Sequence, residues 1–514
     1  TDPLSIAMLY RAETDDVVAY ATSARLAAGP DVEPDRDPLG VAWLPFLGWI
    51  VGDRTGYAST RVLPAGSYVE IGPAYGSRVR FAHPTPWAGD LPSDPDELID
   101  LVHADLSASV RSVAQLPAPR RHADITGGKD SRLVVALMLE EGVADRFTFF
   151  TSGYDHSPDV IVGSRIAERF GLAHEQPQPG TMTDENFRRH LATHVFQTSG
   201  MFSAWEMKGR LWASPALKVS GSVGETLRTN YSAYPALSTV ADLRTQFHGR
   251  NALLRASVLR DDVRAELRAA LDAELVERTD TGGSAPQDLL DTFYVRWRLR
   301  RWFGTYEELG EAGRAFPLYS LVGLQAAFAL GAERRRLDTL HFEVTRRAAP
   351  ELAKMPLADV GWPDALLVDL PDADDYRVPA VRHEGDGPAP TQWRPQRLLD
   401  NLEAARDLLL DERSSPVYDI LDREAVERVL RTPEQATPVQ CRQLFGALAA
   451  AVWLGRHESR ARLGTVPTPD DFPSPAVAAP PSAPPAAPPT APRSETRRRR
   501  IVDIHRRVRA RLAR

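Results

Sequence analysis

Residues 121–139 decide the fold, and they read Arg121-His122-Ala123-Asp124-Ile125-Thr126-Gly127-Gly128-Lys129-Asp130-Ser131-Arg132-Leu133-Val134-Val135-Ala136-Leu137-Met138-Leu139. A short β-like segment runs into two glycines and then into a run with helical spacing, so the stretch predicts a strand, a tight turn and a helix. Glycines let the backbone turn tightly and approach a ligand closely. The free N–H groups and the dipole of a helix start favour negative charge. The stretch therefore predicts an anion site where the helix begins.

The side chains of this turn suit a phosphate group. Two hydroxyls can donate hydrogen bonds to phosphate oxygens, a lysine adds a positive charge, and an aspartate can bind a divalent cation that bridges phosphates. The residues predicted to hold the phosphates are Thr126, Gly127, Gly128, Lys129, Asp130 and Ser131. Two glycines before a helix are by themselves a common connection, so the prediction depends on the complete string.

The chain changes in character along its length. Residues 1–92 carry turn signals between short apolar runs, among them 44–51, and predict a β-rich module of short strands. From Asp94 helical patterns alternate with short β-like segments, which is typical of an α/β domain with a largely parallel sheet. After Asp291 the sequence reads as helices almost throughout. Residues 93–462 are therefore predicted to form an α/β domain with a helical extension.

The C-terminal part differs in composition from the rest. Residues 463–493 are mostly Pro, Ala, Thr and Ser, which bury too little apolar surface to offset the entropy of ordering, and they predict an extended linker. Residues 494–514 contain nine arginines against Glu495 and Asp503, a net charge of +7 that leaves −14 on the rest of the chain. Their apolar residues recur at helical spacing. This segment predicts a basic amphipathic tail, either a docking element or a solvated end.

The overall composition narrows the class of protein. Of the 514 residues 43% are hydrophobic and 25% are charged, which is average for globular proteins. The apolar run 444–454 is too short to span a bilayer and predicts a buried helix. Cys441 is the only cysteine, which excludes a disulfide framework, paired-cysteine zinc sites and mechanisms that need two thiols. Because the sequence opens without a secretory signal, we expect a cytoplasmic protein with no transmembrane segment.

Two further segments accompany the phosphate loop. Residues 147–153 (Phe-Thr-Phe-Phe-Thr-Ser-Gly) predict a second buried strand, and Ser157-Pro158-Asp159 opens a helix that ends at Gly171. Residues 217–225 read Leu-Lys-Val-Ser-Gly-Ser-Val-Gly-Glu. The loop resembles the S-G-G-x-D-S pyrophosphate loop of ATP pyrophosphatases. The three segments together resemble the asparagine synthetase family, which includes β-lactam synthetases and lasso-peptide cyclases.

The resemblance covers most of residues 1–460 and is strongest at 121–174 and 217–231. It implies a parallel-sheet ATP pyrophosphatase domain, of the adenine nucleotide alpha hydrolase type, preceded by a partial β-rich glutaminase-like domain. Residues 1–92 match only the second half of that N-terminal domain, without the Cys nucleophile that hydrolyses glutamine. The missing half could be supplied by a second polypeptide, lost in processing, or not needed.

The resemblance also assigns binding roles to individual residues. The implied cofactors are ATP and Mg²⁺. Ser220 and Gly221 are expected to face the adenine, while Asp130 and Glu225 are expected to hold magnesium. Glu225 stands where the family has Asp, which moves the carboxylate about one methylene further out but keeps an oxygen ligand suited to a hard cation.

Two catalytic residues follow from the same resemblance. Lys354 is one of only four lysines in an Arg-dominated chain and lies in a segment similar to the family's L-P-x-x-x-x-x-x-K region. It would stabilise the charge that develops during acyl transfer, and a surface ion pair is the alternative. Glu311 precedes residues 316–320, which look like the end of the family's E-x-R-x-P-F-L-D segment. It is a candidate base for deprotonating an amine.

These implications combine into a predicted activity. A carboxylate would attack the α-phosphate of ATP, and an amine would then displace AMP from the acyl-adenylate to form an amide. We expect an AMP-forming carbon–nitrogen ligase of natural-product or modified-peptide biosynthesis, acting on small-molecule or peptide carboxylates and amines. Two alternatives stay open: an adenylating enzyme that modifies RNA, and a degenerate, non-catalytic synthetase-like scaffold. The acidic body and the single cysteine argue against RNA, so we do not expect a nucleic-acid partner.

Overall fold

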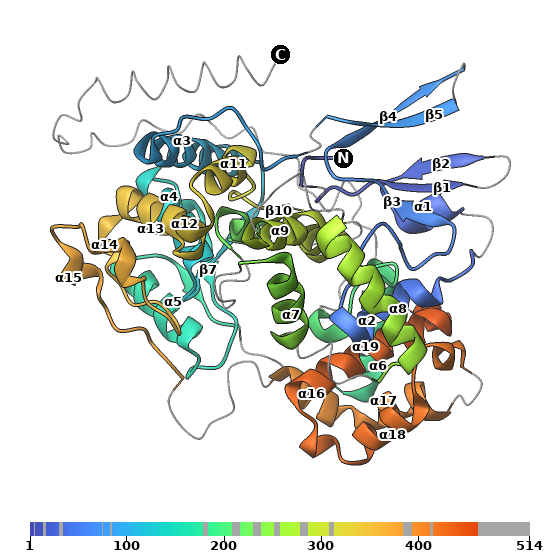
Figure 1. Ribbon diagram of the computed structural model, residues 1–514. Helices are drawn as coiled ribbons and strands as arrows, with labels where there is room; N and C mark the ends of the chain where they lie inside the picture. The colour runs from blue at the N-terminus through green and yellow to red at the C-terminus, as the bar shows by residue number, and fades with distance from the viewer. Residues whose placement is uncertain are drawn as a thin grey trace.

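The computed structural model describes residues 1–460 except 5, 14–16, 30–33, 74–75, 83–84, 178–182, 208–215, 230–237, 251–257, 278–285, 308–312, 384–392 and 412–414. The described chain is a mixed α/β structure, and Figure 1 shows the arrangement of its parts. The predicted linker (463–493), the predicted basic tail (494–514) and the candidate base Glu311 lie outside the described residues.

An all-parallel sheet forms the centre of the α/β part. Its five strands lie in the order β10-β9-β6-β7-β8. They are β6 (Arg120–Asp124), β7 (Thr148–Phe150), β8 (His174–Glu175), β9 (Ala216–Val219) and β10 (Arg314–Ala315). The chain proceeds from β6 outward through β7 to β8, and then returns to the other side of β6 with β9 and β10. The strand order therefore reverses between β6 and β9, which is the topological switch point of the sheet.

The expectation of an α/β class with a largely parallel sheet is confirmed. The predicted strand at 147–153 corresponds to β7, and β9 begins the quoted segment 217–225. The predicted helix after Ser157 is α5 (Pro158–Phe170), and Gly171 ends it in the left-handed region with φ 64°. Strand β10 was not predicted, because two residues in an otherwise helical region carry too little pattern to be recognised.

Helices cover the sheet and share one apolar core with it. Besides α5 they are α3 (Pro95–Ala114), α4 (Lys129–Glu140), α11 (Leu321–Ala329) and α13 (Thr339–Ala348). Leu106 of α3, Leu133 of α4 and Phe149 of β7 are fully buried in this core. Burying each such side chain contributes about 2 kcal/mol, so the shared core fixes the start of α4 against the strand ends.

The N-terminal module consists of two small antiparallel sheets and two helices. One sheet has the order β2-β1-β3 and the other is the hairpin β4-β5. The strands are β1 (Tyr10–Glu13), β2 (Val18–Ala21), β3 (Thr60–Val62), β4 (Ser67–Gly72) and β5 (Gly76–Phe81), and the helices are α1 (Ala24–Ala28) and α2 (Pro38–Leu47). The predicted strands between residues 1 and 92 are thus present in part, and they lie at the upper right of Figure 1.

The prediction of a strand in the apolar run 44–51 is wrong, because its first half belongs to α2. The side chain of Asp37 accepts a hydrogen bond from the backbone of Gly40 (3.0 Å), and Pro38 takes the first helical position. Gly48 ends the helix with φ 88°. Helix α2 is buried almost throughout, and a fully apolar run of this length does not distinguish a buried helix from a buried strand.

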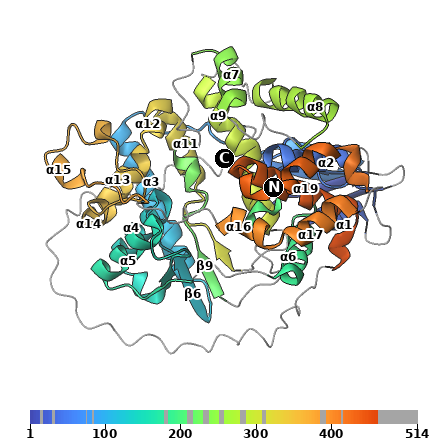
Figure 2. The same cartoon turned by 90° about the horizontal axis from the view of Figure 1, so that it is seen from below.

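A second core joins the N-terminal module to the C-terminal helices. It includes β1, α2, α6 (Asp184–Gln197), α8 (Asp261–Asp272), α9 (Pro286–Phe293) and α19 (Pro438–Leu454). Helix α19 is the buried helix predicted from the apolar run 444–454, and Figure 2 shows it beside α2. Trp453 donates a hydrogen bond to the carbonyl of Gly56 (2.7 Å), which links α19 to the N-terminal module. Among the described residues no helix is long and apolar enough to cross a membrane.

Candidate functional site

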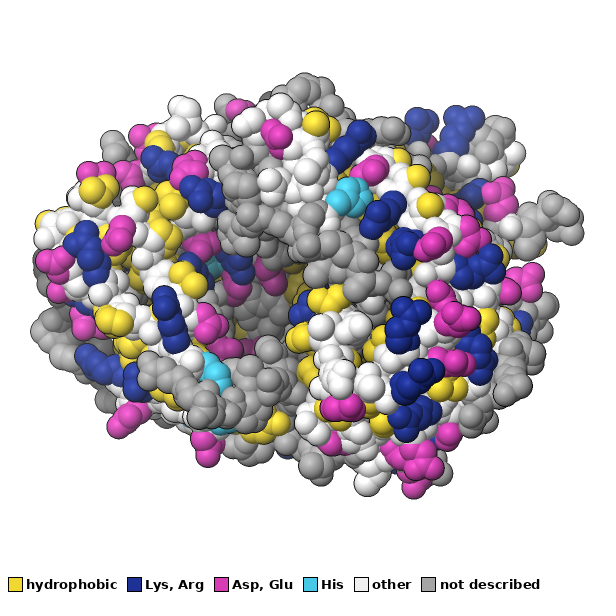
Figure 3. Space-filling model, turned by 60° about the horizontal axis from the view of Figure 1, so that its bottom comes forward, with side chains coloured by type: hydrophobic (Ala, Val, Ile, Leu, Met, Phe, Trp, Pro, Cys, Tyr) yellow, Lys and Arg dark blue, Asp and Glu magenta, His cyan; other side chains and the backbone are white. Residues whose placement is uncertain are grey.

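A cavity of about 320 Å³ lies at the carboxyl ends of the parallel strands, at the switch point between β6 and β9. Space of this size is in the range of ligand sites. Figure 3 shows the molecule hollowed near its middle. We call this cavity the switch-point pocket, and its lining comprises Asp124, Thr126, Phe150, Ser152, Lys218, Ser220, Ser222, Trp302, Phe303 and Arg314.

The predicted phosphate loop borders this pocket through Thr126. Helix α4 begins at Lys129, and its N-cap Gly128 offers no side-chain cap to the first helical turn. The N–H of Gly127 is already used, because it donates to the Asp159 carboxylate (2.9 Å). The side chain of Thr126 accepts a hydrogen bond from the Gly128 N–H (3.1 Å), which closes the turn. The uncapped start of α4 and the neighbouring pocket fit the predicted anion site.

Residues with hydroxyl groups line the pocket, among them Thr126 after β6 and Ser220 and Ser222 after β9. The hydroxyls of Thr126 and Ser131 are 2.8 Å apart, and so are those of Ser220 and Ser222. A hydroxyl that shares a hydrogen bond with its neighbour keeps further acceptor or donor capacity for a ligand. Ser220, predicted to face an adenine, therefore lies in the pocket lining.

Gly221, which was predicted to face an adenine, packs against the first turn of α4. A Cβ at this position would lie 2.5 Å from the Ser131 backbone nitrogen and 2.6 Å from the Asp130 carbonyl carbon. Gly221 is not among the residues that line the pocket. Its lack of a side chain instead lets the loop after β9 touch the first turn of α4, and so it brings the two strand ends together.

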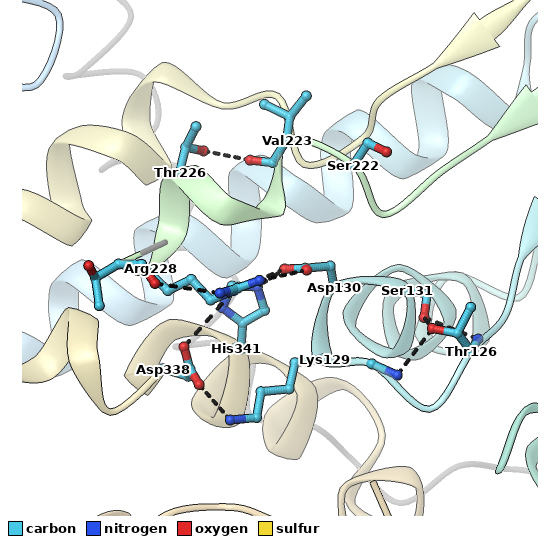
Figure 4. Close-up of polar contacts among 12 residues, drawn as sticks. Thr126, Lys129, Asp130, Ser131, Ser222, Val223, Thr226, Arg228, Asp338 and His341 are labelled. Atoms are coloured by element: carbon cyan, nitrogen blue, oxygen red, sulfur yellow. Dashed lines mark hydrogen bonds and ion pairs between the residues drawn. The ribbon is translucent and has the colours of Figure 1, made fainter. Parts of the chain in front are cut away.

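Asp130 lies in a group of paired charges beside the pocket, shown in Figure 4. Its carboxylate accepts a hydrogen bond from Arg228 (Nη2 to Oδ2, 3.1 Å), and His341 Nε2 lies 2.7 Å from Oδ1. Burial raises the pKa of Asp130, but the charge of Arg228 and the contact with His341 outweigh burial and hold this pKa well below its usual range. Asp130 is therefore an anion whose two oxygens both have partners.

Lys129 and Asp338 complete this group. The Lys129 ammonium forms an ion pair with Asp338 Oδ2 rather than lining the pocket. The other oxygen of Asp338 is 4.0 Å from Nε of Arg228. We refer to Lys129, Asp130, Arg228, Asp338 and His341 as the Asp130 cluster. In it the carboxylates of Asp130 and Asp338 face the guanidinium of Arg228 and the ammonium of Lys129.

Glu225 lies in the turn that follows β9, near Asp130. Its Oε2 atom is buried, and no hydrogen bond to it is formed by the described residues. Burial, and then the negative charge of Asp130, raise the pKa of Glu225 to about 7. A carboxyl in this setting favours a proton or a nearby cation over bare ionisation.

The predicted magnesium site can be compared with this geometry. Asp130 and Glu225 offer the oxygen ligands that Mg²⁺ prefers. Both oxygens of Asp130 are, however, engaged by Arg228 and His341. Among the described residues no group of three or more His, Cys, Asp or Glu side chains is arranged to hold a metal ion. The cluster as arranged therefore does not fit a resident divalent metal bound by Asp130 and Glu225.

Lys354 lies away from the pocket lining. Its Nζ is 2.8 Å from the Asp375 carboxylate. The segment before it is tied to the buried side chain of Arg132, which donates to the carbonyls of Leu352 and Met355 (2.9 and 2.7 Å). The structure thus places Lys354 in a surface ion pair, which was the alternative reading of this residue.

Several residues of the site carried no sequence prediction. Lys218 and Arg314 line the pocket from β9 and β10, and Lys218 Nζ is 4.7 Å from the centre of the Phe150 ring. The sequence did contain a signal for Lys218, because it is a charged residue between Leu217 and Val219, which are both buried in β9. Arg228, Asp338 and His341 gave no such signal, because only folding brings them to Asp130.

Trp302 and Phe303 are contributed to the site by α10 (Arg300–Glu307). Phe303 is buried in an apolar cluster, and both side chains also contribute to the pocket wall. The guanidinium of Arg298 lies 3.6 Å from the centre of the Trp302 ring, which fixes the orientation of that ring. The pocket therefore combines aromatic walls with cations and hydroxyls.

Comparison with known proteins adds no family to this geometry. Neither a scan against protein-family models nor a search of the curated proteins finds a match to this chain.

Proposed function

We propose that the protein is an AMP-forming carbon–nitrogen ligase that adenylates a carboxylate with ATP and couples it to an amine. The observation that carries this proposal is the position of the pocket. It lies outside the carboxyl ends of parallel strands, at the switch point between β6 and β9, which is where open α/β sheets bind nucleotides and related ligands.

The lining supports a nucleotide as the ligand. Phe150, Trp302 and Phe303 give apolar and aromatic surface for a base. Lys218 and Arg314 add positive charge, and the start of α4, which has no side-chain cap, favours an anion nearby. This pattern favours an ATP pyrophosphatase type of domain, with the phosphates at Thr126 and Ser131.

The proposed reaction has two bond exchanges. A carboxylate oxygen attacks the α-phosphorus of ATP, the bond to the bridging oxygen of pyrophosphate breaks, and pyrophosphate leaves. An amine then attacks the acyl carbon, the carbon–oxygen bond to AMP breaks, and a proton is lost from nitrogen. The pocket residues hold the nucleotide and exclude water. Magnesium is part of the proposal only as the ion that ATP carries in solution, and neither Lys354 nor Glu311 is given a step.

The substrates are proposed as a small-molecule or peptide carboxylate and an amine, of the kind used in natural-product or modified-peptide biosynthesis. The resemblance to asparagine synthetases supports this class, together with the single buried cysteine Cys441. Burial raises the pKa of the Cys441 thiol, so it is a poor nucleophile for releasing ammonia from glutamine. Cys441 is therefore not proposed as a source of ammonia for the reaction.

ATP–pyrophosphate exchange tests the proposal, because it isolates adenylation from the unknown amine. The purified protein is screened against carboxylates, and at least one is expected to give exchange that depends on that carboxylate. AMP formation with an added amine is measured next. Absence of exchange and of AMP formation across the panel would refute the ligase.

A nucleotide-binding scaffold is the second candidate. It is favoured by one observation, namely that both oxygens of Asp130 are engaged by Arg228 and His341. Calorimetry with ATP separates the two candidates. A scaffold binds ATP without turnover, whereas the ligase binds ATP and forms AMP when its carboxylate is present.

A further inference from the structure

Arg228 occupies an unusual position among three carboxyl groups. Its guanidinium contacts Asp130 through two nitrogens (Nη2 to Oδ2, 3.1 Å, and Nε to Oδ1, 3.4 Å). Asp338 lies 4.0 Å away on the same side of the guanidinium. Burial lowers the pKa of Arg228, but Asp130, Asp338 and Glu225 together hold that pKa above its ordinary value. Arg228 is thus a fixed cation in an acidic surrounding.

The oxygens around Arg228 include atoms that lack hydrogen-bond partners. Asp338 is 9% exposed, and its Oδ1, the atom nearest Arg228, accepts no hydrogen bond from the described residues. The same holds for the buried Oε2 of Glu225. Buried carboxylate oxygens without partners are costly unless a cation compensates them. Arg228 is a cation whose guanidinium lies 4.0 Å from Asp338 Oδ1 and whose charge also acts on Glu225.

The charges of the Asp130 cluster balance without a metal. Asp130 and Asp338 are matched by Arg228 and Lys129. A guanidinium is planar, permanently charged and weakly hydrated, so it can remain buried where a divalent ion would need several further oxygen ligands. The Asp130 cluster, whose arrangement does not fit a resident magnesium ion, therefore fits the guanidinium of Arg228 as its cation.

We propose that Arg228 takes the place of a divalent metal ion in this site. Its guanidinium pairs with Asp130 and lies 4.0 Å from Asp338, and it gives the start of α4 a permanent positive charge that needs no protein-bound magnesium. The identity of the anion at α4 rests on the proposed function, but the exclusion of metal by Arg228 does not.

Titration with Mn²⁺ alone tests this proposal. The electron paramagnetic resonance signal of the free ion measures how much Mn²⁺ is bound. Wild type is expected to bind no Mn²⁺ at Asp130, so that Asp130→Asn changes nothing in the titration. Arg228→Gln exposes the three carboxylates and is expected to gain one Mn²⁺ site, at least about tenfold tighter than any in wild type, or ~1.4 kcal/mol. Adding Asp130→Asn to that variant should remove the new site.

Arg228→Lys is the matched control, because it keeps the positive charge and should gain no Mn²⁺ site. Two results would overturn the proposal: a Mn²⁺ site in wild type that Asp130→Asn removes, or a folded Arg228→Gln variant without a new site. The first comparison uses only wild type and Asp130→Asn, so it decides the question even if Arg228→Gln does not fold.

Inorganic pyrophosphate separates this inference from the proposed function. Wild type is expected to bind pyrophosphate with affinities within about threefold in excess EDTA and in magnesium, a difference of ~0.7 kcal/mol or less. If pyrophosphate binds only in the presence of magnesium, the inference about Arg228 is wrong, and the proposed ligase function is unaffected. If pyrophosphate and ATP bind under neither condition, the proposed function fails, and the Mn²⁺ titration still decides the role of Arg228.

Discussion

The switch-point pocket and the Asp130 cluster lie side by side at the start of α4, yet they differ in how their charges are used. In the cluster each charged side chain pairs with another, as Lys129 does with Asp338. In the pocket, Lys218 and Arg314 border a cavity of about 320 Å³ from strands of the sheet. The charged residues of the phosphate loop, Lys129 and Asp130, thus form ion pairs with other residues of the protein. Lys218 and Arg314 lie outside the loop and border the space for a ligand. A phosphate loop therefore cannot be assessed from its own residues alone.

The largest expected effect is that of Asp130→Asn. The change leaves Arg228 and His341 beside a neutral amide, and losing these two partly buried, charge-assisted contacts costs about 3 kcal/mol of unfolding free energy. Because the pKa of Asp130 is lowered on folding, its stabilisation is present above the unfolded value of about 3.9 and is lost as the pH falls through the folded value. Urea unfolding at neutral and acidic pH measures this difference. Equal stability of wild type and variant at neutral pH would show that the cluster is not the paired unit described.

Gly221→Ala tests the contact between the two regions. The added Cβ would lie 2.5 Å from the Ser131 nitrogen, so the first turn of α4 must shift away from the loop after β9. Overpacking of this kind costs about 2 kcal/mol. Gly361→Ala is the matched control, since its nearest neighbour, the carbonyl oxygen of Val378, is 3.5 Å away. Thermal unfolding of both variants is the measurement, and similar losses would contradict the close approach at Gly221.

Lys218→Ala and Lys354→Ala separate the pocket from the surface. Lys218 lines the pocket, and a charge-assisted hydrogen bond to a ligand contributes about 1.5 kcal/mol, so ATP affinity should fall roughly tenfold. Lys354 pairs with Asp375, and its removal should change ATP affinity by less than about twofold. Calorimetry on both variants tests the contrast. The reverse order of effects would restore Lys354 as a residue of the site and remove Lys218 from it.

Glu225→Gln gives the smallest expected effect, and its pH dependence is opposite to that of Asp130. The folded pKa of about 7 lies above the unfolded value, so wild type loses stability as the pH rises from about 4.5 to 7. Gln carries no such penalty. The variant should therefore match wild type near pH 4 and exceed it at pH 8 by on the order of 1 kcal/mol. A constant difference across this range would mean that Glu225 is not held in its neutral form by burial and by Asp130.

The elements with local signals were predictable. Helix α5 agrees with its prediction because Ser157, Pro158 and Gly171 mark its ends by backbone preference, whatever the rest of the fold does. The first half of the apolar run 44–51 lies in α2, although the run was predicted to be a strand. A segment that is buried on all sides lacks the periodicity that distinguishes a helix from a strand. Strand β10 is only two residues long and is defined by its parallel pairing with β9, which its own sequence does not indicate.

Local features of the sequence are enough to specify the strand, turn and helix at residues 120–140, together with the anion-favouring start of α4. These follow from backbone freedom, periodicity and composition, which act over a few residues. The pairing of the charged side chains in the Asp130 cluster depends instead on the tertiary structure. Asp130 and His341 are separated by 211 residues, and Lys129 and Asp338 by 209. Electrostatic pairing depends on distance in space and on burial, so the partners of the loop were set when α13 packed against α4.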